Sequence, residues 1–143
     1  MSQENVDIVR RALEVATRRD DEATLALYDP EVEIHGQADG ATYRGLTGVR
    51  EYFRDWYAAW RDFSTGAEEW IDAGEDVIAA LHIRAQGRQS GVPVDQHVWH
   101  VWTLRDGKLW RLRVYATKAE ALEAVGLSES DKPVGQPRRG SRS

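Results

Sequence analysis

The stretch from Ala67 to Ala116 has the pattern of successive β-strands joined by short turns, and it constrains the fold more than any other part of the chain. The predicted strands are 67–73, 76–87, 94–104 and 108–116. The last two are separated by Arg-Asp-Gly-Lys, and Asp-Gly is typical of the tight turn of a β-hairpin. Because consecutive hairpins place neighbouring strands antiparallel, this half of the chain predicts a curved antiparallel sheet.

Three helices are predicted in the first half of the chain. The first begins at Ser2, a residue type that caps helices, and carries apolar residues at spacings of three and four. A short second helix covers Ala23–Tyr28 and is ended by the Asp-Pro that follows it. A third helix begins at Thr47, and its apolar stripe extends to Trp60 and Phe63.

One strand and one further helix complete the pattern. Residues 31–36 alternate between apolar and polar side chains and predict a strand, whereas 36–45 predict a loop. Thr117 and Glu120 form the capping box of a last helix, which ends at Gly126. Helices followed by an antiparallel sheet predict an α+β domain in which the helices cover one face of the sheet.

A single domain accounts for the 143 residues. It is predicted to span residues 1–127, and the polar segment 128–143 is predicted to be disordered. The net charge of -5 argues against a nucleic-acid binder, and the lack of cysteine excludes disulfides and thiolate metal ligands. The start of the chain is charged and no apolar stretch approaches membrane-spanning length, so we expect a cytoplasmic protein that binds no membrane.

His97 and His100 have the H-x-x-H spacing that is typical of a metal site on a helix. Their segment is predicted to be a strand, where residues three apart point to opposite faces of the sheet. The two histidines are therefore not expected to bind one ion together, and no metal site is predicted.

Both faces of this strand carry large aromatic side chains. Alternation puts His97, Trp99 and Val101 on one face, and His100 and Trp102 on the other. A face in water does not normally carry Trp beside Val, so we expect helices to cover one face and a second copy of the chain to cover the other. This predicts a homodimer through the outer face of the sheet; a solvated strand face is the alternative.

The order of these elements resembles the nuclear transport factor 2-like superfamily, and within it the SnoaL-like branch. The resemblance covers about Ser2 to Leu127. It rests on the stretches SQENVDIVRRALEVATRRD, LALYDPEVEIHG, YRGLTGVREYFRDW, GVPV and HVWTLRDGKLWRLRVYATKAEAL. It implies an α+β fold with a cone-shaped, strongly curved sheet, antiparallel or mixed. Three helices of the first half would cover this sheet, with a short C-terminal helix, a pocket inside the cone and a dimer on the outer face.

Members of this superfamily include isomerases, cyclases, hydrolases and non-catalytic binding modules, so the resemblance does not fix an activity. Its ketosteroid isomerases use a carboxylate base with a tyrosine and a protonated carboxylic acid. The resemblance places these three groups at Gly36, Ala12 and His100 respectively. Because Gly36 and Ala12 supply no functional group, isomerisation by that route is not expected. A shift of one residue would bring His35 to the position of the base.

His100 is the candidate catalytic residue, because the resemblance places it toward the pocket and an imidazole exchanges protons near neutral pH. A neutral buried histidine that is hydrogen-bonded to a tyrosine or to Gln96 is the structural alternative. His35 is a second candidate, for which an exposed strand edge is the alternative. The resemblance places His82 and Arg84 on the outer, dimer side of the sheet.

A mainly apolar wall with a few polar tips suits a flat hydrophobic small molecule that has one or two oxygens. The predicted ligand-binding residues are Tyr28, Tyr52, Trp56, Gln96, Val98 and Trp102. The alternative is that the helix aromatics simply fill the core. No phosphate-binding motif occurs, so no nucleotide is predicted, and no other cofactor is expected. The possible functions are acid/base chemistry of the isomerase, cyclase or hydrolase type through His100, non-catalytic ligand binding, and a surface for another protein.

Overall fold

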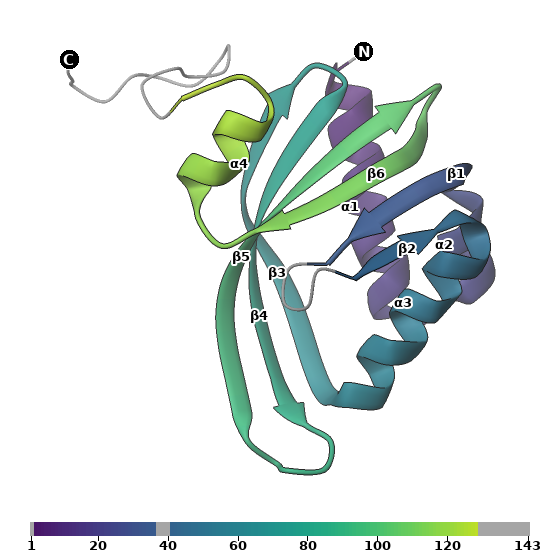
Figure 1. Ribbon diagram of the computed structural model, residues 1–143, viewed down its shortest axis with the longest axis vertical. Coiled ribbons are helices and arrows are strands. Elements are labelled where there is room, and N and C mark those ends of the chain that lie inside the picture. Colours follow the sequence, from purple (N-terminus) through teal and green to yellow (C-terminus); the bar gives the residue numbers. More distant parts are fainter. Residues whose placement is uncertain (1, 37–40, 129–143) are drawn as a thin grey trace.

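A computed structural model of the chain describes residues 2–36 and 41–128. These residues form four helices and six strands (Figure 1). In chain order they are α1 (Ser2–Thr17), α2 (Asp21–Ala26), β1 (Tyr28–His35), β2 (Thr42–Arg44), α3 (Gly45–Ala59), β3 (Trp60–Ala73), β4 (Asp76–Gly87), β5 (Pro93–Arg105), β6 (Lys108–Tyr115) and α4 (Lys118–Ala124). The predicted tail 128–143 lies outside the described residues from position 129 onward.

The six strands form one curved sheet in the order β2-β1-β6-β5-β4-β3. All neighbouring strands are antiparallel except β1 and β6, which are parallel, so the sheet is mixed. The helices α1, α2 and α3 lie on one side of this sheet, and α4 lies on the other side (Figure 1). The predicted α+β fold with a curved sheet, helices of the first half and a short C-terminal helix is confirmed.

Three element boundaries differ from the prediction because backbone pairing with distant strands decides them. The long helix α3 ends at Ala59, since Trp60 is extended and pairs with Gly87 of β4; the prediction that it reaches Phe63 is wrong. Residues 42–44, predicted as loop, form β2 on the free edge of β1. Tyr28 belongs to β1, where it pairs with Leu109, instead of ending the second helix.

The core lies in two layers. The inner layer packs α1 and α3 against the sheet and contains Val6, Val9, Val32, Ile34, Val49, Leu109 and Leu112. On the outer face, α4 of the same chain buries Ile71, Ile78 and Val101 with its own Ala121 and Leu122, and Trp99 packs against this cluster. Val101 therefore needs no second copy to be buried, and this part of the argument for a dimer is wrong.

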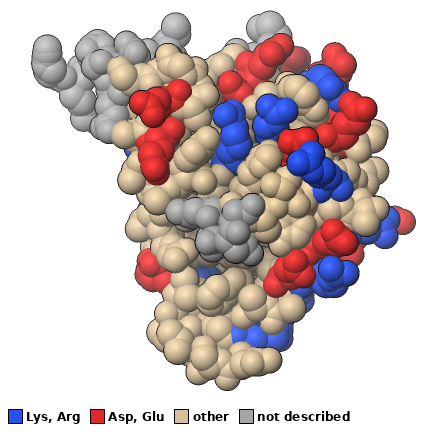
Figure 2. All heavy atoms as spheres, in the orientation of Figure 1, with Lys and Arg blue, Asp and Glu red and all other residues tan. Residues whose placement is uncertain are grey.

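The surface is mixed in charge, and most of the charged residues on the side that Figure 2 draws lie in its upper and right-hand parts. Acidic and basic side chains lie next to one another on this side, so it offers no continuous basic surface of the kind that nucleic-acid phosphates need. Within the described parts of the chain, no helix is long and apolar enough to cross a membrane.

Gly48 of α3 permits the close packing of this helix on Tyr43 of β2. A Cβ atom at position 48 would lie 2.8 Å from the backbone carbon of Tyr43. Alanine normally stabilises a helix by about 1 kcal/mol relative to glycine. Here we expect Gly48→Ala to lower the free energy of unfolding by about 1 to 3 kcal/mol, because backbone must move.

Urea denaturation measures this change, with Gly66→Ala as the control. A Cβ at position 66 would meet nothing within 4 Å, so the control is expected to be neutral or slightly stabilising. A Gly48→Ala protein as stable as the wild type would contradict the predicted contact.

Candidate functional site

A cavity of about 500 Å³ lies between the inner face of the sheet and the helices α1 and α3. This volume is in the range of small-molecule sites. Its wall is mainly apolar, and its members from the helices are Ala12, Leu13, Ala16, Thr17, Tyr52, Phe53, Asp55, Trp56, Tyr57 and Ala59. The strands and the segments next to them contribute Tyr28, Gly36, Tyr43, Trp60, Thr65, Leu81, Ile83, Ala85, Val94, Gln96, Val98, His100, Trp102, Leu112 and Val114.

Alternation along β5 brings the strand's predicted site residues to one place. Gln96, Val98, His100 and Trp102 all line the cavity, whereas His97 is exposed on the opposite face. The other three predicted ligand-binding residues, Tyr28, Tyr52 and Trp56, line it from β1 and α3. The structure thus gathers His100 and all six of these side chains around one space.

His35 lies apart from this group. Its Nε2 is 3.2 Å from Glu33 Oε1 and its Nδ1 is 3.3 Å from Thr42 Oγ1, and it is not part of the cavity wall. The neighbouring Gly36 does line the cavity, as does Ala12. Neither Gly36 nor Ala12 carries a group that can transfer a proton.

His100 is buried among apolar groups, and this burial lowers the pKa of its imidazole to about 4. Burial removes the hydration of the charged imidazolium, so the charged form is disfavoured. His100 is consequently a neutral imidazole at physiological pH. It can donate or accept a hydrogen bond, but it carries no positive charge to attract an anion.

Two buried nitrogen atoms of the wall lack a hydrogen-bond partner among the described residues: His100 Nδ1 and Trp102 Nε1. A purely structural His100 would be hydrogen-bonded to a tyrosine or to Gln96. Neither residue makes such a bond to Nδ1. The two rings are 6.0 Å apart between centroids, so one ligand can contact both. An unsatisfied buried polar atom costs about 1 to 3 kcal/mol, which a ligand oxygen would recover.

Tyrosine hydroxyls add further donors to the wall. Tyr28 packs edge-on against Trp102, with 6.1 Å between ring centroids, and its burial raises the pKa of its hydroxyl. Burial, with a smaller effect from Tyr43, also raises the pKa of Tyr52 to about 12. Both hydroxyls therefore remain protonated at neutral pH and can donate to a ligand oxygen.

The sequence analysis missed a polar pair in the wall. Tyr43 of β2 donates a hydrogen bond to Asp55 of α3 over 3.0 Å, and both residues line the cavity. Asp55 lies three residues after Tyr52, a spacing that puts two side chains on the same face of a helix. This spacing could have placed Asp55 in the wall, whereas Tyr43 fell in a segment predicted to be loop.

Comparison with known families gives a match between residues 9–112 and the SnoaL-like domain family. The chain belongs to this family. A comparison with curated proteins finds no match. The fold found above and the cavity inside its curved sheet agree with this assignment.

Solved structures of similar fold include a nuclear transport factor 2-like protein of unknown function from Burkholderia pseudomallei. It is 23% identical, with a TM-score of 0.73, over 88% of this chain and 99% of that chain. The epoxide hydrolase/cyclase-like enzyme SalBIII, which has a role in pyran ring formation in salinomycin, is 20% identical, with a TM-score of 0.71. The match covers 82% of this chain and 95% of SalBIII. A Mycobacterium tuberculosis protein in complex with estradiol-17β-hemisuccinate is 19% identical, with a TM-score of 0.69, over 82% and 96%. At these identities the likeness shows the fold alone.

The low pKa of His100 makes a prediction about stability. The pKa of an unfolded histidine is about 6.5, so between pH 6.5 and pH 4 the unfolded chain binds more protons at this residue than the folded chain. The free energy of unfolding therefore rises with pH across this window. We expect acidification to remove up to about 3 kcal/mol of stability through this residue alone.

Urea denaturation at several pH values between 7 and 4.5 measures the effect. His100→Gln should lose this part of the pH dependence, whereas His35→Gln, which changes a half-exposed histidine, should retain it. Equal slopes in the wild type and in His100→Gln would mean that His100 is not the titrating group.

Proposed function

We propose that this SnoaL-like domain binds a flat, uncharged hydrophobic small molecule inside its curved sheet. The single observation that carries the proposal is a large apolar cavity whose wall contains two buried ring nitrogens without partners, His100 Nδ1 and Trp102 Nε1. A carbonyl or hydroxyl oxygen of the ligand would accept a hydrogen bond from Trp102. A carbonyl would accept a second one from His100, whereas a hydroxyl could also donate one to it. Both nitrogens are shielded from water, so the proposal requires a small rotation of each ring toward the ligand.

The aromatic residues of α3, together with Trp60 at the start of β3, define the shape of the proposed ligand. Trp56 and Trp60 pack side by side at the cavity, with 6.1 Å between ring centroids, and Tyr52 packs against Phe53 at 5.2 Å. Flat aromatic walls bind flat ring systems by stacking or edge contacts. The M. tuberculosis protein of the same fold binds a steroid ester, which supports a fused-ring ligand as a first probe.

Trp102→Phe tests the proposed hydrogen bond because it removes one N–H group and keeps an aromatic ring. We expect the affinity for estradiol, the uncharged steroid without the hemisuccinate group, to fall about tenfold in calorimetry, as is usual for one buried hydrogen bond. Trp110→Phe is the matched control, since Trp110 does not line the cavity. Equal loss in both variants, or binding by neither wild type nor variant at the solubility limit of the steroid, would count against the proposal.

A second candidate function is acid/base chemistry of the isomerase, cyclase or hydrolase type on the bound molecule. The likeness to SalBIII supports it, and His100 is the catalytic residue that it requires. His35 would take part only if the ligand extended beyond the cavity wall, because His35 lies outside it. Mass spectrometry of a recovered ligand separates the two functions: binding returns the compound unchanged, and catalysis gives a product that His100→Gln abolishes.

We also propose that the domain, which extends to about Leu127, forms a homodimer through the outer face of the sheet. Part of this face is covered by α4, and the rest is polar, with His82, Arg84 and Asp95. A dimer would therefore be held mainly by polar contacts. Analytical ultracentrifugation of the wild type tests it; a monomer would leave this face open to another protein.

A further inference from the structure

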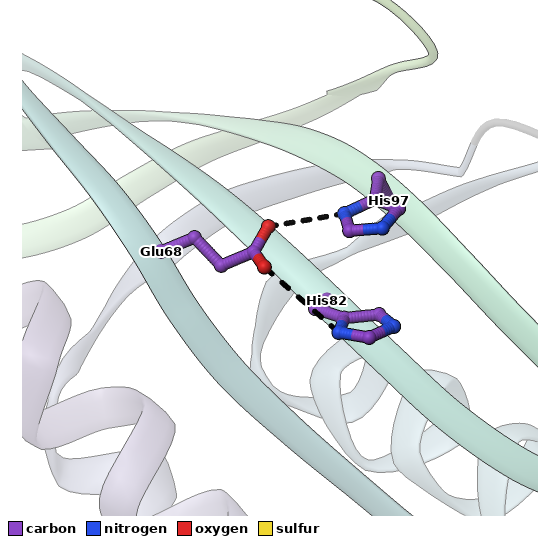
Figure 3. A group of neighbouring side chains, drawn as sticks. All are labelled: Glu68, His82 and His97. Atoms are coloured by element: carbon purple, nitrogen blue, oxygen red, sulfur yellow. Dashed lines mark hydrogen bonds and ion pairs between the residues drawn. The ribbon is translucent and has the colours of Figure 1, made fainter.

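A second group of chemically active side chains lies on the outer face of the sheet, on the side opposite to the cavity. His82 of β4 and His97 of β5 are directly paired across the two strands, and their rings stack with 4.3 Å between centroids and 12° between planes. Glu68 of β3 points its carboxylate toward both rings (Figure 3). Three neighbouring strands thus bring one carboxylate and two imidazoles together, with one ligand atom of each within 4.8 Å of the others.

An irregularity of β3 puts Glu68 in this position. The pairing of β3 with β4 shifts between Ala67 and Glu69, so Glu68 is an extra residue without a partner on β4. Such a bulge changes the direction of a side chain relative to its strand. The residue opposite His82 on β3 is Gly66, where a Cβ would meet nothing within 4 Å, so there is open space beside the histidine.

The hydrogen bonds of His82 determine where its proton lies. Its Nε2 is 2.5 Å from Asp95 Oδ1, and because a carboxylate only accepts, this nitrogen carries the proton. In the neutral imidazole Nδ1 then has a free lone pair, and this Nδ1 faces Glu68 Oε2 at 3.9 Å. Two acceptors therefore face each other at a distance too long for a hydrogen bond. A cation between them would satisfy both.

The geometry is close to that of a metal site with nitrogen and oxygen ligands. Two ligand atoms of a tetrahedral Zn²⁺ ion lie about 3.3 Å apart. His97 Nδ1 is 3.0 Å from Glu68 Oε1, which is slightly shorter than this separation. His82 Nδ1 is 3.9 Å from Glu68 Oε2, which is slightly longer. Because the two rings are nearly parallel, at least one of them has to rotate before both lone pairs can point toward one ion.

We propose that Glu68, His82 and His97 bind a divalent transition-metal ion of the Zn²⁺ type on the outer face of the sheet. Two imidazoles and one carboxylate are a ligand set that Zn²⁺ uses in proteins, with the fourth position open to water. The ion would join β3, β4 and β5 at the point where the bulge interrupts the pairing of β3 with β4. This site is independent of the cavity and of the proposed function.

Asp95 completes the site from the second layer. Histidines that bind a metal through one nitrogen usually donate the other N–H to a carboxylate, which fixes the ring. Asp95 has this role toward His82, and its other oxygen lies 3.5 Å from Arg84 Nε, which holds the carboxylate in place.

Calorimetry with Zn²⁺ alone tests the proposal on the full chain with any affinity tag removed. We expect one ion per chain, and a melting temperature that rises by roughly 10 °C at a Zn²⁺ concentration about 100 times the dissociation constant. His82→Gln, His97→Gln and Glu68→Gln should each weaken binding by at least about tenfold. Asp95→Asn should weaken it while keeping one ion per chain.

His35→Gln is the matched control. It also removes one of the four histidines, and His35 also pairs with a carboxylate, that of Glu33, but no second histidine joins them. The control should bind Zn²⁺ as the wild type does. Wild-type protein that binds no stoichiometric Zn²⁺, binding that survives His97→Gln, or equal loss in His35→Gln would each overturn the proposal.

A spectroscopic test keeps the proposal open to refutation if the variants fail to fold. NMR signals of the imidazole rings can be followed while Zn²⁺ is added to the wild-type chain. Signals of His82 and His97 should shift together with saturation at one ion, and those of His35 and His100 should remain in place. Shifts that include His35 equally, or that leave His82 unchanged, would overturn the assignment.

Discussion

Side-chain alternation along β5 separates the two environments on which the chemistry of this domain depends. His100 and Trp102 point into the cavity, while His97 and Trp99 belong to the outer face. The register of β4 against β5 then adds further side chains to each face, and it places His82 opposite His97. A shift of one residue would exchange the two sets of side chains. The pairing of these strands is therefore a condition for both the cavity and the outer cluster.

The apolar character of the cavity makes it suitable for binding and less suitable for proton transfer. Burial lowers the pKa of His100 to about 4, so charging this ring in the folded protein costs about 3 kcal/mol more than in water. A general base works best when its pKa lies near the working pH. His100 is far below that value, which favours a role as hydrogen-bond partner.

The sequence could predict the parts of the site that depend on local periodicity. The common direction of Val98, His100 and Trp102 follows from alternation, because every strand has this period of two. The remaining parts of the site depend on pairing between strands that are distant in the sequence, which local periodicity does not indicate. Trp60 starts a strand because β4 is available beside it, although its side chain continues the aromatic stripe of the helix. The bulge that directs Glu68 outward depends on the pairing of β3 and β4, and no spacing along the chain indicates it.

The outer face shows that a covered surface does not by itself indicate a second copy of the chain. Trp99 and Val101 indicate a covered surface, and α4 of the same chain covers this part of the face. What this helix leaves open is a group of paired charges and imidazoles, including Arg84 and Asp95. Apolar burial cannot be the main force for association there, so any contact between copies has to satisfy these polar groups. If His82 and His97 bound a metal ion, their side chains would coordinate the ion in place of their present contacts with Glu68. The outer face would then present a different set of polar groups to a partner.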